Sequence, residues 1–172
     1  MKIFGFAGWS GSGKTTLVKA LIPVLIERGL KISTIKHTHH NFDIDRPGKD
    51  SFEHRAAGAH EVVITGAARW ALLHENRGEP EPDIDAMLSR MSPVDLVIIE
   101  GFKSYPHPKI EVYRPEIGKP MICTDEPSVV AVASTAELDI NVPRLDLNDV
   151  EAIADFVVDF CELSSERRHG TA

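Results

Sequence analysis

The sequence predicts an α/β fold in which helices flank a mostly parallel β-sheet. Strand and helix patterns alternate along the chain, and parallel strands need long crossover connections, which are usually helices. A first strand is predicted at residues 2–7, "KIFGFA", a short apolar run that ends in a glycine-rich loop. After this loop, apolar residues recur at the spacing of one helical face until Gly29, which predicts an amphipathic helix.

The remaining elements follow from the same patterns. Short apolar runs predict strands over residues 31–37, 60–66, 69–75, 94–101, 109–114, 119–125 and 129–134. Helical spacing and capping residues predict helices over 50–59, with a capping box from Asp50 to Glu53, over 86–90, and over 150–161 behind Asn148 and Glu151. The strands between Lys109 and Ser134 exceed what a doubly wound sheet uses. We expect part of them to be antiparallel or to reach outside the domain.

Composition restricts the class of protein. The 172 residues are 42% hydrophobic and 26% charged, which predicts one globular domain over 1–163 and a disordered tail over 164–172. A net charge of -7 argues against general nucleic-acid binding. Cys123 and Cys161 lack metal-ligand spacing and are expected in the core. No apolar run suits a bilayer or a signal peptide, so we expect a cytoplasmic protein without membrane contact.

The loop after the first strand carries the strongest functional pattern. "GWSGSGKT" matches G-x-x-x-x-G-K-[ST], which forms a P-loop where it lies between a strand and a helix. Backbone N–H groups and the positive end of the helix hold the phosphates of a nucleotide, and the lysine reaches the β- and γ-phosphates. The pattern therefore predicts a P-loop NTPase fold. The expected nucleotide-binding residues are Gly8, Ser10, Gly11, Ser12, Gly13, Lys14, Thr15 and Thr16.

A P-loop site also needs a carboxylate near its metal ion. Glu100 ends the apolar run "VDLVIIE" and is expected at the carboxyl end of a buried strand, where ligands bind in open α/β sheets. Asp95 lies about 16 Å away at the other end of that strand. We therefore expect Mg²⁺ at Thr15 and Glu100, and catalytic roles for Lys14 and Glu100.

Other polar clusters give weaker indications. His37, His39 and His40 have a spacing that could suit a metal, but loop histidines are more often simply exposed. One of three aspartates could complete the metal shell, although Asp50 equally suits a helix cap; these are Asp43, Asp45 and Asp50. Four cations near strand ends either form an anion-binding surface or face solvent; these are Lys36, Lys103, Lys109 and Arg114.

Five segments in order, "GWSGSGKTTL", "TIKHTHHNFDID", "GKDSFEHRAAGA", "DLVIIEGFK" and "PKIEVYR", resemble the MobB family over nearly the whole chain. These are the GTP-binding accessory proteins of molybdopterin-guanine dinucleotide biosynthesis. The resemblance implies GTP, slow intrinsic hydrolysis, and a homodimer whose interlocked β-structure would use the extra short strands. It also implies cooperation with a MobA-type guanylyltransferase that attaches GMP to molybdopterin, which the accessory protein could itself contact.

Two features of the sequence leave the activity open. No N-K-x-D or T-K-x-D stretch is present to read guanine, and Asp125 in "CTDEP" is the nearest candidate at a predicted strand end. The chain also contains no Gln to orient an attacking water, so hydrolysis would be slow or completed by a partner's residue. Three hypotheses remain: an accessory protein with weak GTPase activity, a small-molecule kinase, and a non-catalytic adaptor organised by nucleotide.

Overall fold

The computed structural model describes residues 1–38 and 42–163. His39, His40 and the predicted tail over 164–172 lie outside the described residues. The chain groups into two compact units, of which the first comprises Met1–His37 with the segment from Ser92 onward, and the second comprises Thr38–Met91. The P-loop and Glu100 both belong to the first unit.

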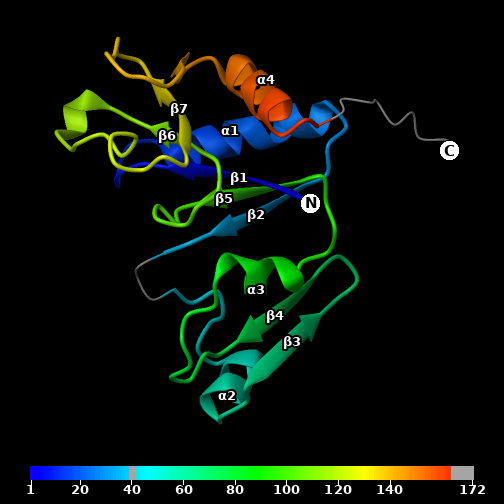
Figure 1. Cartoon of the computed structure of the whole chain (residues 1–172). Helices are drawn as coiled ribbons and strands as arrows, with labels where there is room; N and C mark the ends of the chain where they lie inside the picture. Colours follow the sequence, from blue (N-terminus) through cyan, green and yellow to red (C-terminus); the bar gives the residue numbers. More distant parts are fainter. Residues whose placement is uncertain (39–41, 164–172) are drawn as a thin grey trace, which may run out of the picture. The chain divides into compact units, whose positions relative to one another are not determined.

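The first unit is built on a six-stranded parallel sheet (Figure 1). Its strands run in the order β2-β5-β1-β6-β7-β8, and every neighbouring pair is parallel. Their bounds are β1 Lys2–Ala7, β2 Ile32–Lys36, β5 Leu96–Glu100, β6 Lys109–Val112, β7 Val129–Ser134 and β8 Arg144–Asp146. The helices are α1 Lys14–Glu27, the 3-10 turn η1 Pro115–Ile117, and α4 Val150–Phe160. The predicted α/β class with a mostly parallel sheet is confirmed.

The register of this sheet places three strand ends beside one another. Phe6 of β1 pairs with Glu100 of β5, and Lys36 of β2 pairs with the same glutamate from the far side. On the opposite side of β1, Ala7 pairs with Glu111 of β6. Because all these strands are parallel, their carboxyl ends lie at one edge, and the P-loop leaves β1 at that edge.

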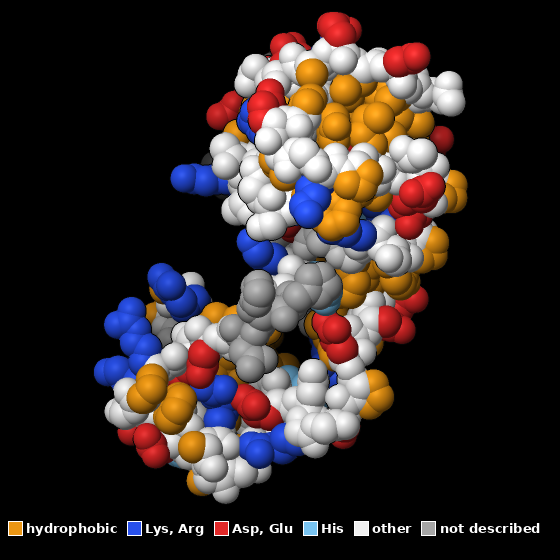
Figure 2. Space-filling model, turned by 90° about the vertical axis from the view of Figure 1, so that its left-hand side faces the viewer, with side chains coloured by type: hydrophobic (Ala, Val, Ile, Leu, Met, Phe, Trp, Pro, Cys, Tyr) orange, Lys and Arg blue, Asp and Glu red, His pale blue; other side chains and the backbone are white. Residues whose placement is uncertain are grey.

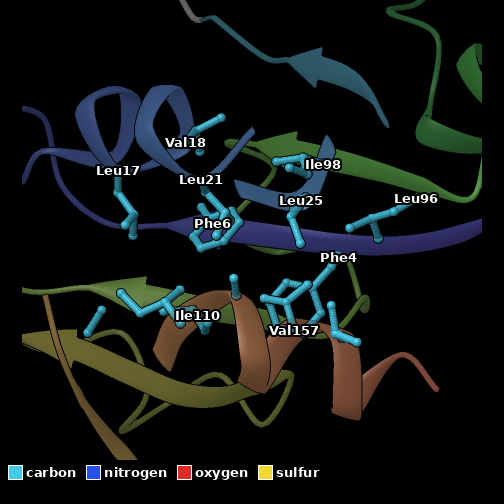
Figure 3. Close-up of a cluster of buried hydrophobic side chains, with 14 of the residues drawn as sticks. Phe4, Phe6, Leu17, Val18, Leu21, Leu25, Leu96, Ile98, Ile110 and Val157 are labelled. Carbon is cyan, nitrogen blue, oxygen red and sulfur yellow. The ribbon is translucent and has the colours of Figure 1, made fainter. Parts of the chain in front are cut away.

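One face of the sheet and both long helices share a hydrophobic core (Figure 3). Phe4 and Phe6 of β1 are fully buried in this core, together with Leu21 and Leu25 of α1 and Val157 of α4. Burying one such side chain contributes roughly 1.5–3 kcal/mol, so this cluster fixes α1 against β1. The packing therefore sets the angle at which the P-loop enters α1.

The other face of β6 carries two fully buried charges. The Nζ atom of Lys109 donates to the carbonyl oxygens of Lys103 and Tyr105 at 2.9 and 2.7 Å, and to Ser128 Oγ at 2.7 Å. The carboxylate of Glu111 accepts from the backbone N–H groups of Ile122 and Cys123 at 2.8–2.9 Å. Buried charges are costly unless they are hydrogen-bonded. The hydrogen bonds of Lys109 and those of Glu111 tie the segments before and after β6 to the sheet.

Glu111 also explains why one predicted strand does not form. The segment over residues 119–125 was expected as a strand, but it is a loop with a turn at Ile122–Asp125. Its N–H groups at Ile122 and Cys123 bind a side chain instead of a neighbouring strand. Cys123 is consequently half-buried on this turn, whereas Cys161 lies in the core as expected.

Two predicted helix caps are also corrected. Asp149, and not Asn148, caps α4, and its Oδ1 accepts from Ala152 N at 2.9 Å. In the second unit, Asp50 is the first helical residue and not a cap, because the capping position falls on Lys49, which makes no side-chain cap. Strand β8, whose burial is partial and whose length is three residues, was not predicted.

The second unit is a hairpin with two short helices. Strands β3 Glu61–Thr65 and β4 Trp70–His74 pair antiparallel, and α2 Asp50–Ala56 and α3 Ile84–Ser89 flank them in sequence. The antiparallel pairing thus lies here and not between Lys109 and Ser134, where β6 and β7 are parallel.

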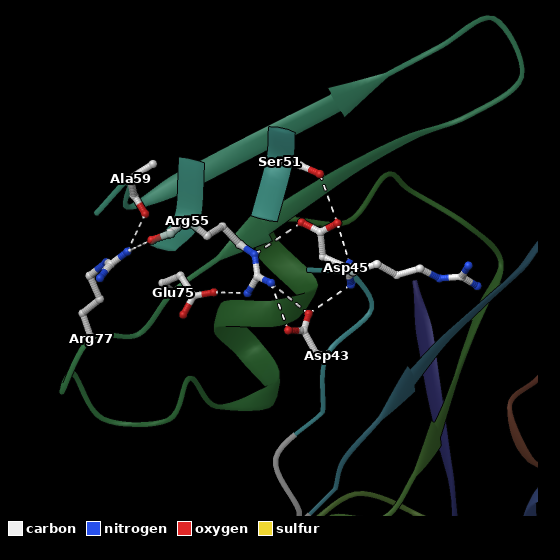
Figure 4. A network of polar contacts seen from close by, with 8 residues as sticks. Asp43, Asp45, Ser51, Arg55, Ala59, Glu75 and Arg77 are labelled. Atoms are coloured by element: carbon white, nitrogen blue, oxygen red, sulfur yellow. Dashed lines mark hydrogen bonds and ion pairs between the residues drawn. The ribbon is translucent and has the colours of Figure 1, made fainter. Parts of the chain in front are cut away.

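Arg55 of α2 is the centre of a polar network in this unit (Figure 4). Its guanidinium binds Asp43 at 2.9 Å and Glu75 at 2.6 Å, and its Nε lies 3.6 Å from Asp45 Oδ2. Arg77 donates to the backbone oxygens of Arg55 and Ala59 at 2.8 and 2.9 Å. The network joins the segment before α2 to the segment after β4. No helix among the described residues is long and apolar enough to cross a membrane.

We expect His107 to make the stability of the protein depend on pH. Its side chain is 1% exposed, its Nδ1 lies 3.1 Å from Tyr105 O, and burial, with the charge of Lys109 adding to it, lowers its pKa from 6.5 to about 4. The unfolded chain therefore binds a proton that the folded chain excludes between these two pH values. The histidine should reduce the free energy of unfolding by about 3 kcal/mol as the pH falls from 7 to 4.

Urea denaturation at several pH values checks this expectation. The variant His107→Asn keeps an N–H donor for Tyr105 O but does not titrate in this range. Its free energy of unfolding should fall less between pH 7 and pH 4 than that of the wild type. Parallel pH profiles for the two proteins would contradict the assignment.

Candidate functional site

The P-loop leaves β1 at a point where no side chain fits. A Cβ atom on Gly8 would lie 2.5 Å from Val112 O and 2.7 Å from Ser12 Oγ, so glycine allows β6 to pack directly against the loop. Gly13, with φ 97°, caps α1 in a left-handed conformation that side chains rarely adopt. This geometry lets the first N–H groups of α1 face a ligand, as an anion site at a helix start requires.

Lys14 opens α1 and is folded back onto the loop. Its Nζ donates to Trp9 O at 2.9 Å. Burial lowers the pKa of Lys14, Glu100 opposes this shift, and the charges of Lys103 and Lys36 add to it. The ammonium thus lies in a region of excess positive charge, where a phosphate group would be favourable.

The other P-loop side chains divide into buried and open groups. Ser12 is 1% exposed, and its Oγ has no hydrogen-bond partner among the described residues. This oxygen packs against Gly8, since it would lie 2.7 Å from a Cβ atom there, and an unpaired buried hydroxyl is costly. The exposed residues, which leave the outer side of the loop open, are Ser10, Gly11, Thr15 and Thr16.

Thr15 and Glu100 meet as the sequence predicts. Thr15 Oγ1 donates to Glu100 Oε1 at 2.6 Å, and Lys36 Nζ lies 3.3 Å from the same carboxylate oxygen and 3.4 Å from the hydroxyl. A hydroxyl and a carboxylate are oxygen donors that fit Mg²⁺, which takes few protein ligands and completes its shell with phosphates and water. The Lys36 ammonium supplies positive charge at this corner.

A cavity of about 390 Å³ begins at this corner and runs along α1 and β2. Its walls are mainly apolar side chains of Val18, Ile22 and Ile98, and Thr15 and Glu100 line one end. The cavity therefore adjoins the place where the metal ion and the terminal phosphate are expected.

Of the four cations predicted near strand ends, three lie around the P-loop and one does not. Lys36 binds Glu100, Arg114 Nε donates to Ser12 O at 3.1 Å, and Lys103 Nζ lies 3.8 Å from the centre of the Trp9 ring. Lys109, the first residue of β6, is instead fully buried on the face of the strand opposite the core. Figure 2 faces the side toward which β2 and β5 run in Figure 1, and several Lys and Arg side chains lie there on the first unit.

Trp9 connects the P-loop to the segment before β6, which contains Lys103, and to the segment after it, which contains Pro120. Its Nε1 donates to Pro120 O at 2.8 Å, and the ammonium groups of Lys103 and Lys119 lie 3.8 and 5.7 Å from its ring centre. Sequence reasoning missed this tryptophan because it occupies a variable position of the P-loop pattern. The available signal was an aromatic residue next to a loop of small residues.

Asp125 is exposed on the turn that replaces the predicted strand. Its N–H donates to Ile122 O at 3.1 Å, and no contact among the described residues joins it to the P-loop. The segment reaches the loop through Pro120 instead. A role for Asp125 in reading guanine stays a prediction.

The remaining candidates lie elsewhere or are only partly described. Asp43 and Asp45 bind Arg55 in the second unit, and Asp50 begins α2. Of the histidine cluster only His37 is described, and its ring lies beside that of Phe102, tilted by 37°, with centroids 4.4 Å apart. The described part of the chain contains no group of three His, Cys, Asp or Glu residues that could hold a metal ion.

Comparison with known proteins identifies close relatives. The family model described as "Molybdopterin guanine dinucleotide synthesis protein B" matches residues 3–135. A protein of Escherichia coli named molybdopterin-guanine dinucleotide biosynthesis adapter protein is 47% identical over 163 residues, covering 93% of each chain. One of the same name from Haemophilus influenzae is 43% identical over 155 residues, covering 90% of this chain and 86% of its own length.

Solved structures agree in fold. A crystal structure of molybdopterin-guanine biosynthesis protein B (mobB) matches with a TM-score of 0.74 at 30% identity, covering 93% of this chain and 99% of its own. MobB from Bacillus subtilis gives a TM-score of 0.74 at 23% identity, with coverages of 95% and 100%. The family match spans most of the sequence and the relatives align over nearly their whole length. This chain belongs to the MobB family.

Proposed function

We propose that this protein is a GTP-binding adapter in the biosynthesis of molybdopterin-guanine dinucleotide. The observation that carries the proposal is the P-loop, where the charges of Lys36 and Lys103 act on Lys14 and the carboxylate of Glu100 opposes them. Such a site favours a polyphosphate anion. The two curated relatives at 47% and 43% identity, both named as adapters in this pathway, support the biological role.

Each residue has a defined task when nucleotide binds. The N–H groups from Gly11 to Thr15 hold the β-phosphate, and Lys14 leaves Trp9 O to reach the γ-phosphate. Thr15 and Glu100 would hold Mg²⁺, which neutralises charge that develops on the phosphates. Lys36 then loses its place between these two oxygens and is free to contact the γ-phosphate.

Hydrolysis by the isolated protein should be slow. The chain contains no Gln, and Glu100 lies against Thr15 and Lys36 at the metal corner. A residue that orients water is therefore to be supplied by the partner, for which we propose a MobA-type guanylyltransferase acting on molybdopterin. Dinucleotide formation should depend on that enzyme and be increased by this chain.

The hairpin of the second unit supports a homodimer. Val63 and Leu72 are cross-strand partners, Trp70 lies one pair farther along on the same face, and their exposed fractions are 62%, 39% and 66%. The opposite face carries the buried Val62, which is 9% exposed. A two-stranded hairpin with an open apolar face is marginal alone and suits pairing with a second copy.

The first prediction from this proposed function concerns nucleotide binding. Wild type with Mg²⁺ should bind GTP more tightly than ATP, and Lys14→Ala should weaken GTP binding by roughly 100-fold or more, because a charge-assisted contact to the phosphates is lost. Isothermal titration measures both. Lys31→Ala, at the opposite edge of the sheet, is the matched control and should bind like wild type. Equal GTP binding by wild type and Lys14→Ala would exclude this site, and preference for ATP with an acceptor-dependent turnover would favour a kinase.

The second prediction uses Trp9 as a reporter. Lys14 must leave Trp9 O when phosphates bind, so the surroundings of the indole should change. In a Trp70→Phe background, Trp9 is the only tryptophan, and GDP or GTP should shift its fluorescence. Lys14→Ala in the same background should remove this response. If the fluorescence of Trp9 in the Trp70→Phe variant stays unchanged at saturating nucleotide, the loop does not rearrange.

The third prediction concerns the hairpin face. Trp70→Glu should convert a dimer to monomers, since a charge would be buried at the proposed interface. Sedimentation equilibrium measures the mass, and GTP affinity per chain should stay unchanged because Trp70 is not part of the P-loop. Ile26→Glu, an exposed apolar residue of α1, is the control and should stay dimeric. A wild-type monomer, or a Trp70→Glu dimer as stable as wild type, would refute the interface.

A further inference from the structure

Arg114 lies against the P-loop from the end of β6. It lies two residues after Val112, whose carbonyl oxygen would be 2.5 Å from a Cβ on Gly8, so this end of β6 packs on the start of the loop. Arg114 Nε donates to Ser12 O at 3.1 Å. A Cβ on Gly13 would lie 3.7 Å from Arg114 Nε and 3.8 Å from its Nη2. The guanidinium therefore lies beside the residues that open α1.

The charge of Arg114 lacks an anionic partner in the part of the chain that the structure describes. Among the described residues no carboxylate forms an ion pair with it. Arg28, which is also half-buried, binds both Glu151 and Asp155 at 2.7 Å. Arg144 likewise binds Glu137 at 2.8 Å. Since a half-buried cation is favourable only with compensating partners, Arg114 is the arginine beside the loop that an anion would stabilise.

The single hydrogen bond to Ser12 O does not account for an arginine. A guanidinium has five N–H donors, and the bond to the loop uses only Nε. A glutamine could supply that donor, because its Nε2 occupies the same place along the side chain. What only arginine adds is the charged fork of Nη groups, whose geometry matches phosphate oxygens.

We propose that Arg114 binds the nucleotide from within the same chain, through the α- and β-phosphates that the P-loop amides hold. Ser12, whose carbonyl oxygen accepts from Arg114, also has a buried hydroxyl without a hydrogen-bond partner among the described residues. Lys14 and Lys36 serve the γ-phosphate and metal end, where Glu100 lies. Arg114 serves the opposite flank. This inference rests on the nucleotide binding proposed above and assigns a further residue to it.

Titration of GDP and GTP with Mg²⁺ into three variants tests the proposal. Arg114→Gln keeps a donor for Ser12 O but removes the charged fork, and should weaken GDP and GTP about equally, by roughly 10-fold or more. Arg114→Lys keeps the charge but not the fork, and should lie between Arg114→Gln and wild type. Arg144→Gln changes an arginine that already has a carboxylate partner, and should bind as wild type does.

The salt dependence of the nucleotide affinities distinguishes a contact between Arg114 and phosphate from a purely structural role, in which Arg114 only holds the loop at Ser12 O. Wild-type affinity should fall more steeply with ionic strength than that of Arg114→Gln, because one charge fewer meets the nucleotide. If Arg114→Gln binds GDP and GTP as wild type does, Arg114 only braces Ser12 and the inference is wrong. A loss confined to GTP would overturn the assignment to the α- and β-phosphates. Absence of nucleotide binding in the wild type would instead refute the proposed function itself.

Discussion

The packing of β1 between β5 and β6 is the constraint on which the site depends. β1 is hydrogen-bonded on both sides, with Phe6 opposite Glu100 and Ala7 opposite Glu111. Its buried phenylalanines fix α1 on one face of the sheet, so the loop between them has little freedom. The loop can pass β6 only because Gly8 has no side chain. One strand thereby brings together a carboxylate from β5, a guanidinium from the end of β6 and the first turn of α1.

The face of β6 opposite the core extends this constraint to the surrounding loops. Lys109 and Glu111 alternate with Ile110 and Val112, so charges lie where a sheet covered by a helix would carry apolar residues. Backbone groups, together with the Ser128 hydroxyl at Lys109, satisfy both charges, which makes the segments 101–108 and 113–128 part of the packed structure. Lys103 and Pro120 reach Trp9 from these segments. The buried charges thus position the groups that surround the P-loop without contacting it themselves.

The parts of the fold that sequence predicts are those in which local pattern and tertiary packing agree. The P-loop, α1 and Glu100 were predictable because strand end, glycine spacing and apolar periodicity all indicate one arrangement. Residues 119–125 have the composition of a strand, yet the N–H groups of Ile122 and Cys123 donate to the carboxylate of Glu111 in β6 instead of to a neighbouring strand. Asp50 resembles a cap, but the helix begins at Asp50 itself and the capping position falls on Lys49. Lys109 looked like a surface cation because nothing local reveals that two carbonyl oxygens of the segment 101–108 and the hydroxyl of Ser128 enclose it.

Charge balance explains why the nucleotide should matter to more than the P-loop. Around the loop lie four cations, Lys14, Lys36, Lys103 and Arg114; among the described residues Lys36 is paired with a carboxylate, that of Glu100, and Lys14 donates to a carbonyl oxygen of its own loop. A polyphosphate would give these cations anionic partners and would draw the Lys14 ammonium away from Trp9 O. Trp9 also binds Pro120, so the same step would act on the segment 113–128. That segment is anchored by Glu111 at Ile122, two residues after Pro120. If the segment 113–128 changes position when phosphate binds, the adapter would present a surface to its partner enzyme that depends on the nucleotide.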